Sequence, residues 1–215
     1  MTGELKVPFI TRWSDEREVS RADLCLSTKG LFYRHDDAAD RDKFGALWAR
    51  TVGRAGVGEP RFRDVSFSRQ RQAMRDLLCQ VCAGPASTTR LGTLFLLEGT
   101  VRSAAELEEE PTGQPPLCLP CARLSREQCP RLVRRYTAVR AKKPTIWGVF
   151  GVPYLPPTPF LPAMGGLVPE PRTLQVGYGR ADLRFVLAHQ LLRQLRRVTV
   201  IDLDAELARS PAGQL

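Results

Sequence analysis

The sequence predicts an α+β protein: a small core made of a tight turn, a hairpin and a helix, with a β-rich N-terminal flank and a C-terminal helix. Two observations carry this prediction. Strand-like and helix-like patterns are mixed along 215 residues, of which 43% are hydrophobic, as in ordinary globular proteins. Two Cys-x-x-Cys pairs also bracket the middle of the chain. We divide it into residues 1–60, 61–150 and 151–215, which could form one continuous domain.

The region 1–60 reads as short strands and turns. Two apolar runs flank a Lys29-Gly30 turn within residues 24–33, which predicts a hairpin. Residues 45–50 could form a short strand, and the glycines of residues 53–60 predict a loop that ends the region. The acidic stretch 35–42, which begins at His35, lacks the spacing of an EF-hand and predicts a solvated loop.

The region 61–150 mixes the two patterns. Ser68 can cap a helix over residues 69–78, residues 91–101 fit a hairpin strand, and residues 106–114 form an acidic loop. Helical patterns follow over residues 121–129, and Pro130 indicates that a second helix starts there. Residues 145–150 predict another strand.

The region 151–215 begins with a proline-rich segment, residues 152–171, which predicts extended backbone. It could wrap over the protein's own core or bind a protein partner. Asp182 can cap a helix that runs to about Arg197. An apolar stripe at helical spacing would face the core or meet a partner: Leu183, Val186, Leu187, Leu191 and Leu195.

The two cysteine pairs are the strongest motif: Cys79 with Cys82, and Cys118 with Cys121. Four thiolates match the tetrahedral preference of Zn²⁺, and a two-residue spacer lets both sulfurs of a pair reach one ion. The 35 residues between the pairs imply an insertion relative to short zinc fingers. We therefore predict one structural zinc ion, and we expect Cys25 and Cys129 to be buried thiols.

A knuckle, a hairpin and a second pair at the start of a helix resemble the treble-clef zinc finger over residues 77–140. This family includes the HNH nucleases, whose hairpin region carries a histidine that acts as general base. The chain has no histidine between Cys82 and Cys121, because His35 and His189 lie outside that segment. The resemblance therefore implies how the four cysteines are arranged around a metal ion, and it implies no activity. A degenerate nuclease remains a minor alternative for the function. The cysteine pattern is also similar to that of uncharacterised actinobacterial proteins, which implies no ligand.

The positive charge concentrates around the cysteines. The chain carries a net charge of +9, and residues 61–150 hold fifteen basic and eight acidic residues. Arginines near a zinc-anchored helix suit phosphate contacts, although a merely solvated face is an equal alternative. The candidate nucleic-acid-binding residues are Arg69, Arg71, Arg75, Arg123, Arg126, Arg131, Arg134, Arg135, Arg140, Lys142 and Lys143.

Several classes are not expected from the sequence. There is no secretory signal and no run of about 18 apolar residues that would cross a membrane, so we expect a cytoplasmic protein. No phosphate-binding loop and no nucleophile elbow is present, and no nucleophile–base pair can be named. We predict a non-catalytic zinc protein that binds nucleic acid; a zinc-stabilised protein-interaction or assembly component is the main alternative.

Overall fold

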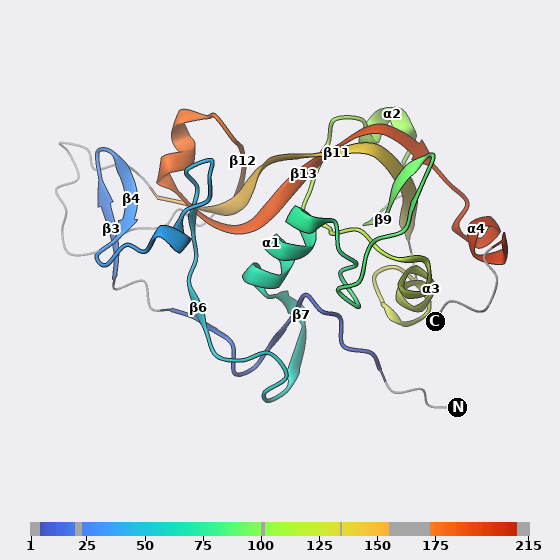
Figure 1. Ribbon diagram of the computed structural model, residues 1–215, viewed down its shortest axis with the longest axis horizontal. Helices are drawn as coiled ribbons and strands as arrows, with labels where there is room; N and C mark the ends of the chain where they lie inside the picture. The colour runs from blue at the N-terminus through green and yellow to red at the C-terminus, as the bar shows by residue number, and fades with distance from the viewer. Residues whose placement is uncertain (1–4, 20–22, 100–101, 134, 155–172, 210–215) are drawn as a thin grey trace.

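Two long antiparallel strands form the spine of the molecule (Figure 1). The computed structural model describes residues 5–19, 23–99, 102–133, 135–154 and 173–209. Strand β11 spans Tyr136–Pro153 and strand β13 spans Val186–Val200. They pair along almost their whole length, with register shifts near Gly148 and Gly151 where the ribbon bends.

Five shorter strands complete a seven-stranded sheet. One half has the order β10-β13-β11-β9-β8, with β8 (Thr88–Thr89), β9 (Gly92–Glu98) and β10 (Pro111–Thr112). In the other half, β12 (Leu174–Gly177) pairs with β11, and β5 (Leu47–Trp48) lies parallel to β13. All three regions of the sequence therefore contribute strands to one sheet.

Small two-stranded elements surround this sheet. They are β1 (Thr11–Trp13) with β7 (Pro60–Val65), β2 (Arg17–Glu18) with β6 (Thr51–Val52), and β3 (Leu24–Ser27) with β4 (Gly30–Tyr33). Figure 1 shows the β3–β4 hairpin at one end of the long axis and helix α4 at the other. The 3₁₀ helix η2 (Ala38–Asp40) follows that hairpin.

In the described part of the chain, four α-helices lie along the sheet and at its ends: α1 (Phe67–Asp76), α2 (Ala104–Leu107), α3 (Leu119–Gln128) and α4 (Leu203–Arg209). Helix α1 packs on β13 through the buried amide of Gln70. Its Oε1 accepts from the N–H of Leu191 at 2.9 Å, and its Nε2 donates to the carbonyls of Leu191 and Gly113. This bonding satisfies a buried side chain and fixes the helix on the spine.

The short-range predictions are largely confirmed. The hairpin at residues 24–33 and the helical stretch at residues 121–129 are present, the latter within and just beyond α3. The helix predicted over residues 69–78 is present as α1, but it begins at Phe67 with Ser66, not Ser68, as its N-cap. Residues 145–150 are extended, within the much longer strand β11. The acidic loop 106–114 contains the end of α2 and the short strand β10.

Two helix predictions are wrong. Residues 182–197 form the 3₁₀ helix η3 (Ala181–Phe185) followed by β13, which is mostly buried on both faces as far as Leu195, so this part of the strand shows little alternation of apolar and polar residues. No helix starts at Pro130: the chain turns, with the N–H of Leu132 donating to the carbonyl of Cys129, and then enters β11. Most of the proline-rich segment, residues 155–171, lies outside the described residues.

Candidate metal centre

The fold brings the four predicted cysteine ligands together. The Sγ atoms of Cys79, Cys82, Cys118 and Cys121 all lie within 4.8 Å of one another. The first pair follows α1, which ends at Leu77 in the left-handed conformation. Cys118 is the N-cap of α3, and Cys121 lies in its first turn. The macrodipole of α3 therefore favours negative charge on this second pair.

A tight backbone turn shapes the first pair. The N–H of Cys79 donates to the carbonyl of Gly84 at 2.7 Å, and the N–H of Ala83 donates back to Cys79 at 2.9 Å. Ala83 adopts a positive φ of 60° to close this turn. The N–H of Gln80 also donates to the carbonyl of Pro116 at 3.0 Å, which ties the two cysteine segments together. The backbone thus holds both pairs in place.

The sulfur geometry suits a tetrahedral metal ion. The Sγ atoms of Cys82 and Cys118 are 3.8 Å apart. A tetrahedron of sulfurs at about 2.3 Å from a central Zn²⁺ has edges of about 3.8 Å. A disulfide would bring two sulfurs to about 2.05 Å. The four cysteines are free thiols that could hold one metal ion.

The pKa shifts of the clustered thiols also indicate that a cation would stabilise them. Hydrogen bonds from the Cys121 thiol and from nearby backbone N–H groups outweigh burial and lower the pKa of Cys79 to about 4. Burial and the neighbouring Cys79 thiolate raise the pKa of Cys118 to about 11. The hydrogen bond with Cys79 and burial raise the pKa of Cys121 as well. A divalent cation would remove this mutual repulsion and bind all four groups as thiolates.

The cluster is part of a hydrophobic core. Cys79 and Cys121 are buried against Leu94 of β9 and Leu117, while Cys82 is exposed. Leu203 and Leu207 of α4 close this core from the C-terminal side. The cysteine cluster and this core therefore join β9, α3 and α4 into one lobe, at the end of the molecule where Figure 1 shows these elements.

The predicted nucleic-acid-binding residues fall into several environments. Arg123, Arg135, Lys142 and Lys143 are exposed. Arg75, Arg126 and Arg131 form surface ion pairs with Asp76, Asp204 and Glu98. Arg71 stacks over the ring of Trp48 at 4.2 Å. Arg134 lies outside the described residues.

Arg69 and Arg140 have structural partners instead. Arg140 is 0% exposed, and its guanidinium donates to the carboxylate of Glu206 and to the carbonyls of Ser87 and Gly92. Arg69 donates to both carboxylate oxygens of Glu16, at 2.6 and 2.7 Å, and to the carbonyls of Phe9 and Thr11. Neither guanidinium is available to a phosphate. The prediction fails for these two residues because sequence alone does not show which arginines are buried.

The stripe predicted as a possible partner surface is buried. Leu183 lies on η3, and Val186, Leu187, Leu191 and Leu195 on β13, all in the core.

His189 of the same strand stacks on Phe67 with ring centroids 4.4 Å apart and has its Nε2 3.8 Å from Glu18. His35 is exposed and follows β4.

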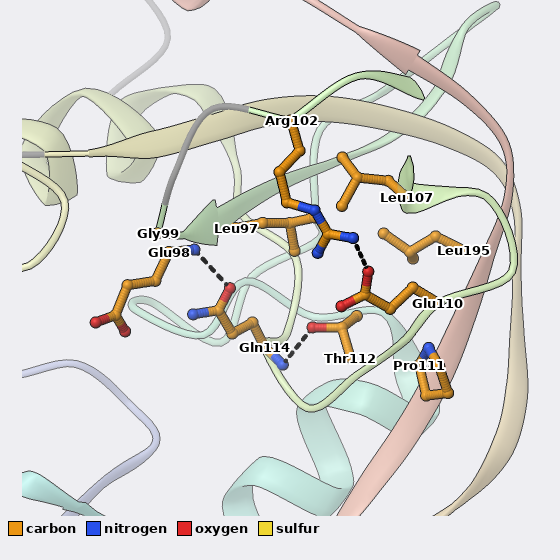
Figure 2. A pocket seen from close by; sticks show the side chains of 10 residues that line it. All are labelled: Leu97, Glu98, Gly99, Arg102, Leu107, Glu110, Pro111, Thr112, Gln114 and Leu195. Atoms are coloured by element: carbon orange, nitrogen blue, oxygen red, sulfur yellow. Dashed lines mark hydrogen bonds and ion pairs between the residues drawn. The ribbon is translucent and has the colours of Figure 1, made fainter. Parts of the chain in front are cut away.

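One further hollow opens on the lobe that holds the cysteines. It has a volume of about 330 Å³ and is lined by the end of β9, α2 and β10. Figure 2 shows Arg102 and Glu110 joined in an ion pair beside Leu107 and Leu195. These two charges neutralise each other, and Glu98, the third charged residue of the lining, pairs with Arg131 at 3.3 Å, so each charged side chain of the hollow already has a partner.

Sequence reasoning missed two groups of exposed residues. Arg90 is exposed in the turn between β8 and β9, and β9 pairs with β11 up to Ala141, the residue before Lys142. Phe62 is exposed on β7 between Arg61 and Arg63, and the alternation of basic and aromatic residues could have signalled it.

No protein-family model, curated protein or solved structure matches this chain. Within the described residues, no helix is long and apolar enough to span a membrane.

Proposed function

We propose that the four cysteines bind one structural Zn²⁺ in a treble-clef arrangement. The observation that carries this proposal is the packing of four Sγ atoms within 4.8 Å of one another. A tetrahedral four-sulfur site is typical of zinc or an iron–sulfur cluster. Four protein ligands leave no open position for a substrate, which favours a structural role. The turn at residues 79–84, the β8–β9 hairpin and the start of α3 follow the treble-clef order.

Metal analysis tests the zinc site. The purified wild-type protein should contain about one zinc per chain. Cys82→Ser should lose the zinc, since three thiolates and a hydroxyl bind it much more weakly. Cys129→Ser is the matched control, because Cys129 packs near the cluster but is not one of its four members. Zinc retained by Cys82→Ser, or the visible absorbance of an iron–sulfur cluster, would contradict the proposal.

The lobe that holds the cysteines, here called the zinc lobe, binds nucleic acid through its exposed basic residues in this proposal. We use the name zinc-lobe face for five of them, which are contributed by the β8–β9 turn, α3, the residue before β11 and β11 itself: Arg90, Arg123, Arg135, Lys142 and Lys143. Within the described residues, none of the five forms an ion pair, so their charge is free for phosphate. Contacts to phosphate supply most of the affinity in sequence-independent binding.

The pairing of Lys143 with Arg196 supports a role for this face. These two residues lie directly opposite each other on β11 and β13. Like charges in that position destabilise a sheet. The amide of Gln194 and the carboxylate of Glu109 offset the charge of Arg196, whereas that of Lys143 is left for an anion. A bound phosphate would relieve the repulsion.

Charge reversal tests the basic face. Wild-type protein should bind a 20-base-pair duplex at low salt, with affinity that falls steeply as salt rises. The double variant Lys142→Glu, Lys143→Glu should lose most of this binding and keep its zinc. The control is Lys29→Glu, Lys43→Glu, which makes the same change in net charge far from the zinc lobe. Absence of duplex binding by the wild type, or equal loss in both variants, would refute this function.

A further inference from the structure

The β1–β7 ribbon contains a bulge that presents an aromatic side chain to solvent. Thr11 pairs with Val65, and the next residue, Arg12, pairs with Arg61. Residues 62–64 are therefore extra on β7 and have no counterpart on β1. Bulges of this kind often re-aim side chains at functional sites. Phe62 lies in the bulge with 52% of its surface exposed.

Phe62 is the most exposed phenylalanine of the described residues, at 52% against 45% for Phe44 and 37% for Phe32. Phe44 is 45% exposed, but its ring stacks on Tyr178 with centroids 4.2 Å apart. Within the described chain, the ring of Phe62 has no aromatic or cationic partner of this kind. The apolar surface of the ring is exposed to water, and its burial against a ligand would contribute favourable binding free energy.

The charges around Phe62 are those of unpaired arginines. Arg61 and Arg63 flank it, and Arg54 lies in the loop that leads into β7; all three are exposed. None of them forms an ion pair among the described residues. Among the neighbouring acids, Asp64 pairs with Arg12 at 2.6 Å and Asp15 Oδ2 accepts from the N–H of Arg54 at 2.7 Å, while Glu59 is exposed just before β7.

The ribbon is held rigidly. The buried pair between Arg69 and Glu16 fastens it to α1, with the Arg69 guanidinium also bonded to two carbonyls of the β1 segment. The loop 53–59 is fixed on the other side: the N–H of Ser14 donates to the carbonyl of Glu59 at 2.9 Å, and the N–H of Glu59 donates to Ser14 Oγ at 3.0 Å. A ligand would thus meet a preformed surface and lose little binding free energy in ordering it.

We propose that Arg54, Arg61, Phe62 and Arg63, which we term the bulge platform, bind single-stranded nucleic acid. The ring of Phe62 stacks on one base while the arginines contact the flanking phosphates. A duplex keeps its bases stacked inside, so a protruding ring reaches a base face only on a single strand. The flanking arginines favour this polyanion over a protein partner. This inference extends the proposed function, because it names the form of nucleic acid that a second surface recognises.

Two labelled oligonucleotides test the platform on the full-length, zinc-loaded protein: a 20-nucleotide oligo-dT and a 20-base-pair duplex, followed by fluorescence anisotropy at one low salt concentration. Phe62→Ala should weaken oligo-dT binding about 5- to 150-fold, the range measured for removal of one base-stacking side chain. It should leave duplex affinity unchanged. Phe62→Trp should retain oligo-dT binding. Phe32→Ala is the control, because Phe32 is also exposed, on the distant β3–β4 hairpin.

The outcomes separate this inference from the zinc-lobe function. If Phe62→Ala binds oligo-dT as tightly as the wild type, the platform is overturned, whether or not Lys142→Glu, Lys143→Glu abolishes duplex binding. If Phe62→Ala and Phe32→Ala weaken oligo-dT binding equally, the effect is not specific and the platform is also overturned. If Phe62→Ala loses oligo-dT binding while Lys142→Glu, Lys143→Glu retains binding to both probes, the platform stands and the zinc-lobe face fails.

Discussion

Replacement of Arg140 with methionine should strongly destabilise the fold without removing a nucleic-acid contact. The side chain is fully buried on β11. Its Nε donates to Glu206 Oε1 at 2.9 Å and its Nη2 to Glu206 Oε2 at 2.6 Å, and Nη1 donates to Gly92 at 3.0 Å. Methionine fills much of the space of the arginine stem but leaves the carboxylate and the carbonyls without their donor.

The magnitude follows from the burial of the pair. Removal of one partner of a buried ion pair costs about 3–5 kcal/mol. Glu206 has 15% of its side chain exposed, so water can partly compensate, and we expect a loss of about 3 kcal/mol. For a chain of this size, that loss lowers the melting temperature by about 6–12 °C. A double variant with Glu206→Leu should recover part of the loss, because no buried charge is then left unpaired.

Chemical denaturation followed by circular dichroism measures these free energies, with zinc present throughout. Lys142→Met is the matched control: Lys142 is exposed two positions along the same strand, and its replacement should change stability by less than about 0.5 kcal/mol. The two variants should rank the other way in duplex affinity. Folded Arg140→Met should bind the duplex like the wild type, and Lys142→Met should bind it more weakly. Near-wild-type stability of Arg140→Met, combined with lost binding, would refute the assignment.

Three further predictions concern stability. Removal of the metal by a chelator should unfold the zinc lobe, with a loss of circular dichroism that added zinc reverses. The Arg50 guanidinium holds the pKa of Asp40 below its usual value. The ionised carboxylate therefore stabilises the fold at any pH above the pKa of Asp40 in the unfolded chain, and this stabilisation is lost as the pH falls towards the pKa in the folded protein. The difference in unfolding free energy between wild type and Asp40→Asn should be present at pH 7 and shrink below about pH 4. Gly92 and Gly99 both have positive φ, but only at Gly92 would a Cβ overlap the backbone of β11; Gly92→Ala should therefore cost about 1–3 kcal/mol more than Gly99→Ala in the same denaturation assay.

The cysteine cluster could be predicted from the sequence because the geometry of each pair is local. Each Cys-x-x-Cys pair sets two sulfurs within one turn, and the helical pattern predicted over residues 121–129 overlaps α3, which begins two residues earlier, at Leu119. The course of residues 186–200 could not be predicted this way. Its apolar residues suit a helix, and only pairing with β11, distant in sequence, makes the segment a strand. The bulge at Phe62 likewise depends on the register against β1.

Several arginines of the chain are bonded inside the protein, so fewer of them are available to nucleic acid than the sequence suggests. The number that can contact phosphate determines how steeply binding depends on salt. Arg193 shows the other use of arginine: its guanidinium donates to the carbonyls of Met74 and Arg75 at the end of α1, groups that the helix itself leaves unbonded. Arg69 and Arg140 are engaged in the same internal way. If all eleven predicted residues contacted phosphate, the slope of log affinity against log salt would be about −10 on duplex DNA. The five exposed, unpaired residues of the zinc-lobe face allow a slope of at most about −4.5. A titration between about 50 and 200 mM salt distinguishes the two values, and a slope near −10 would mean that further bases contact the nucleic acid, either arginines paired in this structure or exposed arginines outside the zinc-lobe face, such as those of the bulge platform.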